Sequence, residues 1–159
     1  MNAPSVSITQ ARAESDIALV KELFVEYAAS IGIDLEYQGF SKELAGLPGK
    51  YAPPSGDLLL ATTNGEAVGC VALRALDPAK LELKRLYVRP STRGMGLGKQ
   101  LVEAAISAAR QGGYAELRLD TLETMVPARA LYSSMGFVEI PPYGGACLPG
   151  TKFYALALL

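Results

Sequence analysis

The amino-acid sequence predicts a mixed α/β fold with a mostly antiparallel N-terminal meander, a strand–helix–strand unit, and a C-terminal helix and strands. Three observations lead to this prediction. Two apolar runs, 57–63 and 66–76, are separated by Asn64-Gly65, a dipeptide that favours a tight hairpin turn. A glycine-rich loop at 94–98 opens a helical stripe of apolar residues, and another strand-like run follows that helix. A short helix and two further strand-like runs complete the chain.

The N-terminal part is predicted to hold one short strand and one long helix. Residues 6–10 have a strand-like pattern, and apolar residues then recur with helical spacing. We expect Ser15 to cap this helix and Asp16 to lie in its first turn, where a carboxylate is favoured. The stretch 32–56 is rich in glycine and proline, and we expect loops there with a short helix at 41–47.

The rest of the chain alternates between strands and helices. Residues 81–88 form a third strand-like run, which Pro90 ends. The helix that follows the glycine loop is predicted to stop at Gly112-Gly113. The remaining predicted elements are a strand at 114–120, a helix at 125–135, and final strands at 137–140 and 151–158.

Length and composition indicate one globular domain spanning residues 1–159. Half of the residues are hydrophobic (50%) and 19% are charged, which is a globular and not a disordered composition. The net charge of −1 lacks the basic excess of nucleic-acid-binding proteins, so no nucleic-acid partner is expected. No signal peptide is recognised, and no run approaches the ~18 apolar residues of a membrane span. We therefore expect a soluble cytoplasmic protein.

The chain contains no histidine and two cysteines, Cys70 and Cys147. This composition excludes catalytic Ser-His-Asp and Cys-His arrangements and a zinc site of the usual ligand types, so no metal is expected. Cys70 lies in an apolar run, where a buried and inert thiol is expected. Acid–base chemistry must therefore use Glu, Asp, Tyr, Lys or Cys.

The glycine loop has the features of an anion-binding site. Successive glycines let backbone N–H groups turn toward one point, and a helix N-terminus adds a partial positive charge. Residues 84–99 also carry five basic side chains and no acidic one: Lys84, Arg85, Arg89, Arg93 and Lys99. A phosphate-containing ligand is therefore indicated.

Two common phosphate-binding motifs do not fit this loop. A Walker loop needs glycine at the position of Arg93 and serine or threonine at the position of Gln100. A dinucleotide fingerprint needs the spacing G-x-G-x-x-G, whereas the glycines here are Gly94, Gly96 and Gly98. A plain nucleotide-binding protein is thereby disfavoured.

Two motifs resemble those of the GNAT acetyltransferase superfamily. The loop from Arg93 to Gly98 matches R/Q-x-x-G-x-G/A, and residues 128–137 match A-x-x-L-Y-x-x-x-G-F. Glu82 lies eleven positions before Arg93, where histone-type members of the superfamily place a glutamate base. The resemblance covers about 57–138 and implies a GNAT-like acyl-CoA N-acyltransferase fold with acetyl-CoA as co-substrate.

The resemblance also implies where acetyl-CoA binds. Its pantetheine arm is expected to pair with backbone groups at the strand end, at Leu86, Tyr87 and Val88. Its pyrophosphate is expected on the backbone of the loop, at Arg93, Gly94, Met95, Gly96, Leu97, Gly98 and Lys99.

The implied reaction is direct attack of an amine on the thioester within a ternary complex. Tyr132 of the second motif is the expected acid that protonates the departing thiolate, although its ring packing against the sheet would also explain it. Glu82 is the candidate base, and pairing with a cation such as Lys84, on the same strand face, is the alternative. Many members carry asparagine where this chain has Met125, so one polar contact is missing here.

The acceptor is not fixed by the sequence. We expect a primary amine of a small molecule, such as an amino acid or a polyamine. Residues 32–57 hold four acids against two lysines, which would suit a cationic amine, and ordinary solvated charge explains them equally well. A non-catalytic acyl-CoA sensor is the alternative function. Members of the superfamily are often dimers, so a homodimer is a further possibility that the sequence does not decide.

Overall fold

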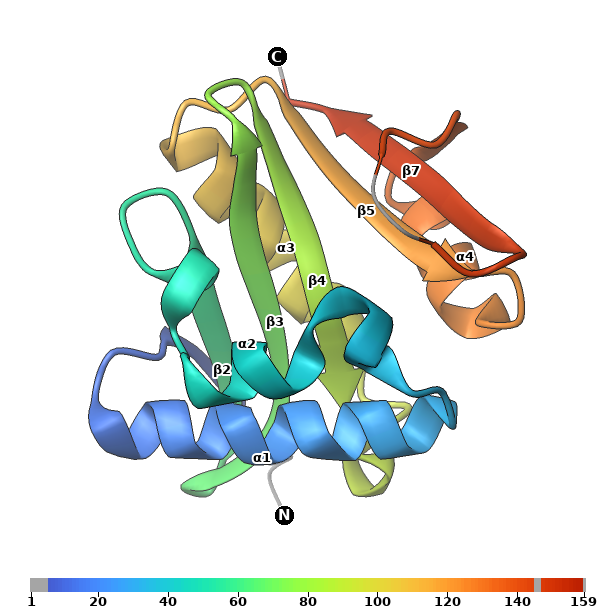
Figure 1. The fold of residues 1–159 in the computed structure, drawn as a ribbon. Helices are drawn as coiled ribbons and strands as arrows, with labels where there is room; N and C mark the ends of the chain where they lie inside the picture. The colour runs from blue at the N-terminus through green and yellow to red at the C-terminus, as the bar shows by residue number, and fades with distance from the viewer. Residues whose placement is uncertain (1–5, 145–146, 159) are drawn as a thin grey trace.

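The computed structural model describes residues 6–144 and 147–158 of the chain. Within these residues seven strands form one sheet, which α-helices flank (Figure 1). The strands are β1 (Val6–Gln10), β2 (Asp57–Thr63), β3 (Glu66–Asp77), β4 (Lys80–Val88), β5 (Glu116–Leu122), β6 (Val138–Ile140) and β7 (Thr151–Ala157). The helices are α1 (Glu14–Ile31), α2 (Phe40–Ala45), α3 (Leu97–Gln111) and α4 (Val126–Ser134), with the short 3-10 helices η1 (Leu35–Gln38), η2 (Gly49–Tyr51) and η3 (Pro90–Thr92).

The strand order in the sheet is β1-β2-β3-β4-β5-β7-β6. β1 to β4 form an antiparallel meander, β5 returns parallel to β4 after α3, and β7 pairs antiparallel with both β5 and β6. The predicted mixed sheet is confirmed. At the hairpin turn Asn64 has φ 51° and Gly65 has φ 80°, the positive values that a type I′ turn requires.

Different helices cover the two faces of the sheet. In Figure 1, α3 lies behind β3 and β4, whereas α1 and α2 lie on the opposite face. Successive strand residues point to opposite faces, so Leu59 of β2 packs on the α3 side while Leu58 and Leu60 pack on the α1 side. Phe24 of α1 is fully buried there, which contributes about 2–3 kcal/mol. Cys70 of β3 is fully buried in the same core, as expected, and burial raises the pKa of its thiol.

Strands β4 and β5 are paired over only part of their length. Their partners are Lys80↔Glu116, Leu81↔Leu117 and Glu82↔Arg118. Figure 1 shows β5 turning away from β4 beyond this point, while β5 stays paired with β7 from Glu116 to Leu122. The C-terminal half of β4 therefore has no strand partner on its β5 side.

A β-bulge at Arg85 changes the alternation of β4. Arg85 has φ 58°, which is uncommon for a residue other than glycine, and the β3–β4 register shifts across it. Before the bulge Leu81 and Leu83 pack into the α3-side core, whereas after it Leu86 and Val88 do. The extra residue thus reverses the alternation: the side chains of β4 that follow Arg85 point to the opposite face of the sheet from the one that simple alternation along the strand predicts.

Two predicted details of the elements are wrong. The helix cap is Ala13, whose N–H donates to the Asp16 carboxylate at 3.3 Å, while Ser15 lies inside the first turn. The strand predicted from Tyr114 begins at Glu116, because the chain after α3 first binds the connection between β3 and β4. Among the described residues, no helix has both the length and the apolar character needed to cross a membrane.

Candidate active site

The glycine loop between η3 and α3 presents backbone N–H groups that bind no other described part of the protein. Gly94 has φ 87° and Gly96 has φ 73°, and a Cβ at either position would meet no atom within 4 Å. Backbone conformation, not crowding, therefore requires glycine there. From Gly94 to Lys99 no backbone N–H donates a hydrogen bond within the described residues, because α3 begins at Leu97 and leaves its first donors without helical partners. This row of donors fits a phosphate group.

Three of the five basic residues predicted around the loop point elsewhere. Arg85 makes a two-bond ion pair with Glu43, at 3.0 and 3.1 Å. Arg89 pairs with Glu26 at 2.7 Å and also donates to the Ala67 carbonyl. Lys84 lines the cavity described below. The five basic side chains of this segment therefore do not all face the loop, because the bulge and the strand alternation separate them; Arg93 and Lys99 remain at the loop.

The end of β4 adds a free backbone donor beside the loop. The N–H of Arg89 donates to Val68 of β3 at 2.8 Å, so the alternation directs the Val88 N–H to the side from which β5 has diverged. The Arg93 side chain donates to the Val88 carbonyl at 3.2 Å. Arg93 thereby ties the loop to the strand end.

Tyr132 lies in α4 with its ring in the core and its hydroxyl unbonded. The ring packs against Phe137 and Tyr154, with centroids 5.7 and 6.4 Å away, and the residue is 5% exposed. Among the described residues the Tyr132 hydroxyl makes no hydrogen bond. Burial raises its pKa, with nearby Tyr27 and Asp120 adding to the rise, so the hydroxyl stays protonated at neutral pH.

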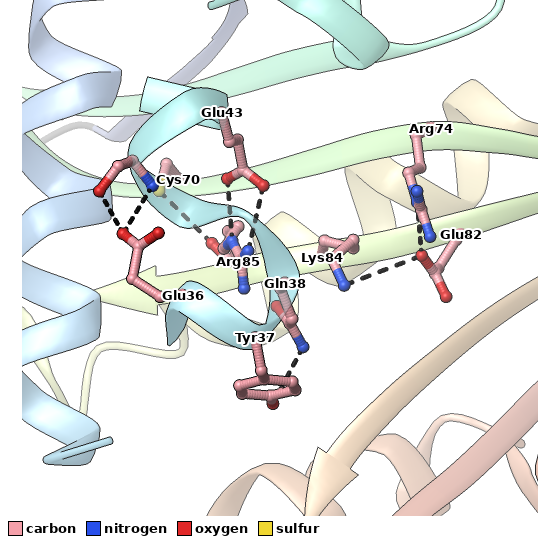
Figure 2. Close-up of polar contacts among 10 residues, drawn as sticks. Glu36, Tyr37, Gln38, Glu43, Cys70, Arg74, Glu82, Lys84 and Arg85 are labelled. Carbon is pink, nitrogen blue, oxygen red and sulfur yellow. Dashed lines mark hydrogen bonds and ion pairs between the residues drawn. The ribbon is translucent and has the colours of Figure 1, made fainter. Parts of the chain in front are cut away.

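Glu82 is the centre of a buried polar network on the α2-side face of the sheet. Its carboxylate accepts from Arg74 Nε at 2.7 Å and from the Tyr143 hydroxyl at 2.5 Å, and Lys84 Nζ lies 3.9 Å away. Figure 2 shows Arg74, Glu82 and Lys84 side by side along β3 and β4, with the Arg85–Glu43 pair further along. The predicted proximity of Lys84 is confirmed, and Glu82 is 2% exposed. A phenol and two cations therefore hold this carboxylate in place.

Two cavities meet at the point where β4 and β5 diverge. The larger, of about 750 Å³, lies beneath α2 and η2 and includes Glu82 and Tyr143. The smaller, of about 40 Å³, is enclosed by β4, β5 and η1, and includes Met125. Five residues line both cavities: Tyr37, Gln38, Lys84, Arg85 and Asp120. A ligand between the strands would therefore face a ligand in the larger cavity across Lys84 and Asp120.

Sequence reasoning missed Asp120, Arg74 and Tyr143. Asp120 was included only as the end of a strand, although an acid at the end of a strand parallel to its neighbour is a recognisable signal. Burial raises the pKa of its carboxyl. Arg74 lies opposite Glu82 in the β3–β4 register, which only the paired strands reveal. Tyr143 follows β6 in a loop, and no motif marks it.

Comparison with known proteins identifies the family to which the chain belongs. The sequence profile of the GNAT acetyltransferase family matches residues 20–137. The chain belongs to this family. An uncharacterized N-acetyltransferase of Schizosaccharomyces pombe is 39% identical to this chain. The alignment covers 99% of this chain and 98% of that protein.

Solved structures of acetyltransferases share the fold of this N-acetyltransferase. A GNAT-family acetyltransferase of Staphylococcus aureus Mu50 superposes with a TM-score of 0.80 at 26% identity, covering 98% of this chain and 100% of that one. A GNAT-family acetyltransferase of Elizabethkingia anophelis, with acetyl-CoA bound, gives a TM-score of 0.62 at 21% identity, covering 96% and 98%. The family profile and the Schizosaccharomyces pombe relative place this chain among the GNAT N-acetyltransferases, which are enzymes, and disfavour a non-catalytic sensor.

The N-acetyltransferase should tolerate Asp120→Asn without loss of stability at pH 8. Burial raises the pKa of Asp120 in the folded protein above the ordinary Asp value of about 3.9. The stability that the buried neutral carboxyl contributes is therefore present below a pH of about 3.9. It is lost as the pH rises through the folded-state pKa, because the buried group must then ionise. The amide removes that destabilisation. We expect a Tm at pH 8 equal to or above the parent's, and a difference that closes at pH 4, both measured by thermal unfolding.

Asp57→Asn is the matched control for this prediction. Asp57 accepts from Arg12 at 2.6 Å, so its amide variant should have a lower Tm at pH 8. A clear loss of Tm at pH 8 for Asp120→Asn as well would show that attraction to Lys84 outweighs burial, contrary to this account.

Proposed function

We propose that the enzyme transfers the acetyl group of acetyl-CoA to a primary amine of a small molecule by direct attack in a ternary complex. The observation that carries the proposal is the joining of two spaces at Lys84 and Asp120. One opens between the diverging strands β4 and β5, and the other is a cavity of about 750 Å³, a size suited to a small molecule. Two substrates would thus meet from opposite sides.

The chain's own groups fit acetyl-CoA. The backbone N–H groups of Gly94, Met95, Gly96, Leu97, Gly98 and Lys99 and the side chain of Arg93 would hold the pyrophosphate. Backbone groups of Leu86, Tyr87 and Val88 would pair with the pantetheine arm, because β4 has no strand partner there. When bound, acetyl-CoA supplies a thioester carbonyl for attack by a neutral amine.

Four groups have proposed roles in the transfer. The Val88 N–H would stabilise negative charge on the carbonyl oxygen. Tyr132 would give its proton to the departing thiolate, since burial keeps its hydroxyl protonated. Glu82 would take the amine's proton through a water, since Arg74 and Tyr143 already occupy its oxygens. One proton leaves the nitrogen for Glu82 and one passes from Tyr132 to the sulfur, so the protein is restored once Glu82 releases its proton to solvent and Tyr132 takes one up.

Titration with acetyl-CoA, followed by thermal unfolding, tests the binding part of this proposal. At a hundred times Kd, binding adds about 2.7 kcal/mol, which raises the Tm of a domain of this size by roughly 5–10 °C. Absence of a shift at millimolar acetyl-CoA, in folded protein free of copurified CoA, would contradict the proposed cofactor site.

Gly96→Ala should weaken acetyl-CoA binding at least tenfold. A side chain at φ 73° costs about 1 kcal/mol and reorients the N–H groups that face the phosphate. Gly65→Ala is the matched control, because Gly65 has φ 80° with equally open surroundings at the distant hairpin. Both variants should lose similar stability, and only Gly96→Ala should raise the Kd measured by calorimetry. Equal Kd values would remove the loop from the binding site.

A further inference from the structure

The acids of residues 32–57 are engaged in structural contacts, so they do not form a rim for a cationic acceptor. Asp34 caps η1 by accepting from the Glu36 N–H at 2.9 Å. Glu36 in turn accepts from the backbone N–H and the hydroxyl of Ser41 at the start of α2. Asp57 accepts from Arg12 at 2.6 Å and does not line the large cavity.

Glu43 is the one acid of that stretch that lines the large cavity, and it is paired there. Its two oxygens accept from Nε and Nη2 of Arg85, at 3.0 and 3.1 Å. The Arg85 side chain is only 3% exposed and is stacked on Phe40, 5.4 Å from the ring centroid. The charges of Glu43 and Arg85 neutralise each other, and the pair holds α2 on the sheet.

The lining of the large cavity has more basic than acidic groups. The basic residues are Lys42, Lys50, Arg74, Lys84 and Arg85, and the acidic residues are Glu43, Glu82 and Asp120. Five basic side chains thus face three acidic ones across this cavity. An acceptor that carried only positive charge would enter a cavity of its own sign.

Arg74 has hydrogen-bonding capacity left over. It donates to Glu82 through Nε alone, and among the described residues its two terminal amino groups make no hydrogen bond. The Arg74 side chain is 29% exposed at the cavity wall. Lys42 and Lys50 form no ion pair with any described residue. A planar guanidinium with two free donors suits a carboxylate, which can accept both.

Asp120 is the acid that remains for the amine. Glu82 is occupied by Arg74, Lys84 and Tyr143, whereas Asp120 accepts no hydrogen bond from a described side chain. Asp120 also lies where the two cavities meet. In the sheet Arg74 and Arg118 flank Glu82 on β3 and β5, and Asp120 lies two residues beyond Arg118. Arg74 and Asp120 therefore border one cavity from two strands, β3 and β5, that lie on either side of β4.

We infer that the acceptor is a small amine that also carries a carboxylate, with its ammonium group at Asp120 and its carboxylate on the terminal amino groups of Arg74. This inference rests on the proposed transfer to a small-molecule amine and names the acceptor's class. It selects amino-acid-like acceptors over polyamines.

Release of free CoA thiol from acetyl-CoA tests this inference with matched acceptors. The panel consists of the proteinogenic amino acids, their carboxamides, and putrescine and spermidine. We expect the best amino acid to exceed its own carboxamide by about 10- to 100-fold in kcat/KM, the size of one lost charge-assisted interaction. Arg74→Gln also removes a hydrogen bond to Glu82, so it should slow transfer to both substrates, but it should abolish most of the ratio between the amino acid and its carboxamide.

Two further variants separate recognition from structure. Arg74→Lys should restore part of the preference, because it keeps the charge and loses the paired geometry. Arg110→Gln makes the same chemical change at an exposed residue near the end of α3, outside both cavities, and should leave the preference unchanged. Each variant's Tm is measured to confirm folding. An equal loss on acid and carboxamide in Arg74→Gln would make Arg74 structural and overturn the inference.

Other outcomes also decide the matter. A preference for carboxamides or polyamines would overturn the inference while keeping the proposed function. If acetyl-CoA stabilises the protein but no amino acid is acetylated, the acceptor class named here is wrong. If acetyl-CoA gives no stabilisation, the proposed function fails first, and this inference fails with it.

Discussion

Replacing Tyr132 by phenylalanine should lower kcat by about 10²-fold or more while leaving the Kd for acetyl-CoA unchanged. The substitution removes only a hydroxyl that makes no hydrogen bond within the described residues, and the ring contacts with Phe137 and Tyr154 remain. Burial keeps that hydroxyl protonated, so in the parent enzyme it is available as an acid when the thiolate leaves. Steady-state kinetics with thiol release, together with calorimetric binding of acetyl-CoA, measure the two quantities.

Tyr154→Phe is the matched control for this result. Tyr154 belongs to the same aromatic cluster, and its hydroxyl accepts from Arg129 Nε at 3.1 Å. Its loss should change kcat less than threefold. If Tyr132→Phe retains full kcat, Tyr132 serves only to pack α4 on the sheet. If its Kd for acetyl-CoA rises as steeply as kcat falls, its role is in binding.

Replacing Glu82 by glutamine should both destabilise the protein and slow transfer. The amide leaves Arg74 and Lys84 without their counter-charge in a mostly buried network, a loss of about 3 kcal/mol. For a domain of this size the Tm should fall by roughly 6–12 °C. At a temperature well below the Tm, kcat/KM at pH 7 should fall at least tenfold and recover toward high pH, where more of the amine is already neutral.

Two comparisons separate these effects. Glu26→Gln breaks the more exposed pair with Arg89 and should lower stability by only about 1 kcal/mol, with no change in the pH–rate profile. The double variant Glu82→Gln/Arg74→Gln should be less destabilised than the sum of the single variants, because the unpaired cation is removed with its partner. A pH–rate profile for Glu82→Gln parallel to the parent's would leave Glu82 a structural role alone.

The local elements of the fold were predicted from the sequence because their signals are local. Asn64-Gly65 marked the hairpin, and both residues have the positive φ that the turn needs. The glycine loop was likewise placed correctly before α3, because only glycine accommodates the backbone at Gly94 and Gly96. The predicted cap at Ser15 was wrong, because the Asp16 carboxylate reaches back to the Ala13 N–H and takes that role.

The neighbourhood of the site could not be predicted in the same way. The bulge at Arg85 has no local sequence signal, yet it reverses the alternation of the residues that follow it. For this reason Arg85 and Arg89, adjacent to the loop in sequence, end in ion pairs with α2 and α1. Arg74 and Tyr143 reach Glu82 only because three separate segments of chain converge on it.

The sequence by itself determined the order of strands and helices, the conformation of the glycine loop and the family resemblance, because turn chemistry, periodicity and short motifs act over a few residues. Only the tertiary structure decided which charges face one another. The divergence of β4 from β5 joins two cavities at Asp120, and strand pairing sets Arg74 against Glu82. The net charge of a cavity depends on side chains that are distant in the sequence, and these side chains come together only when the sheet has formed.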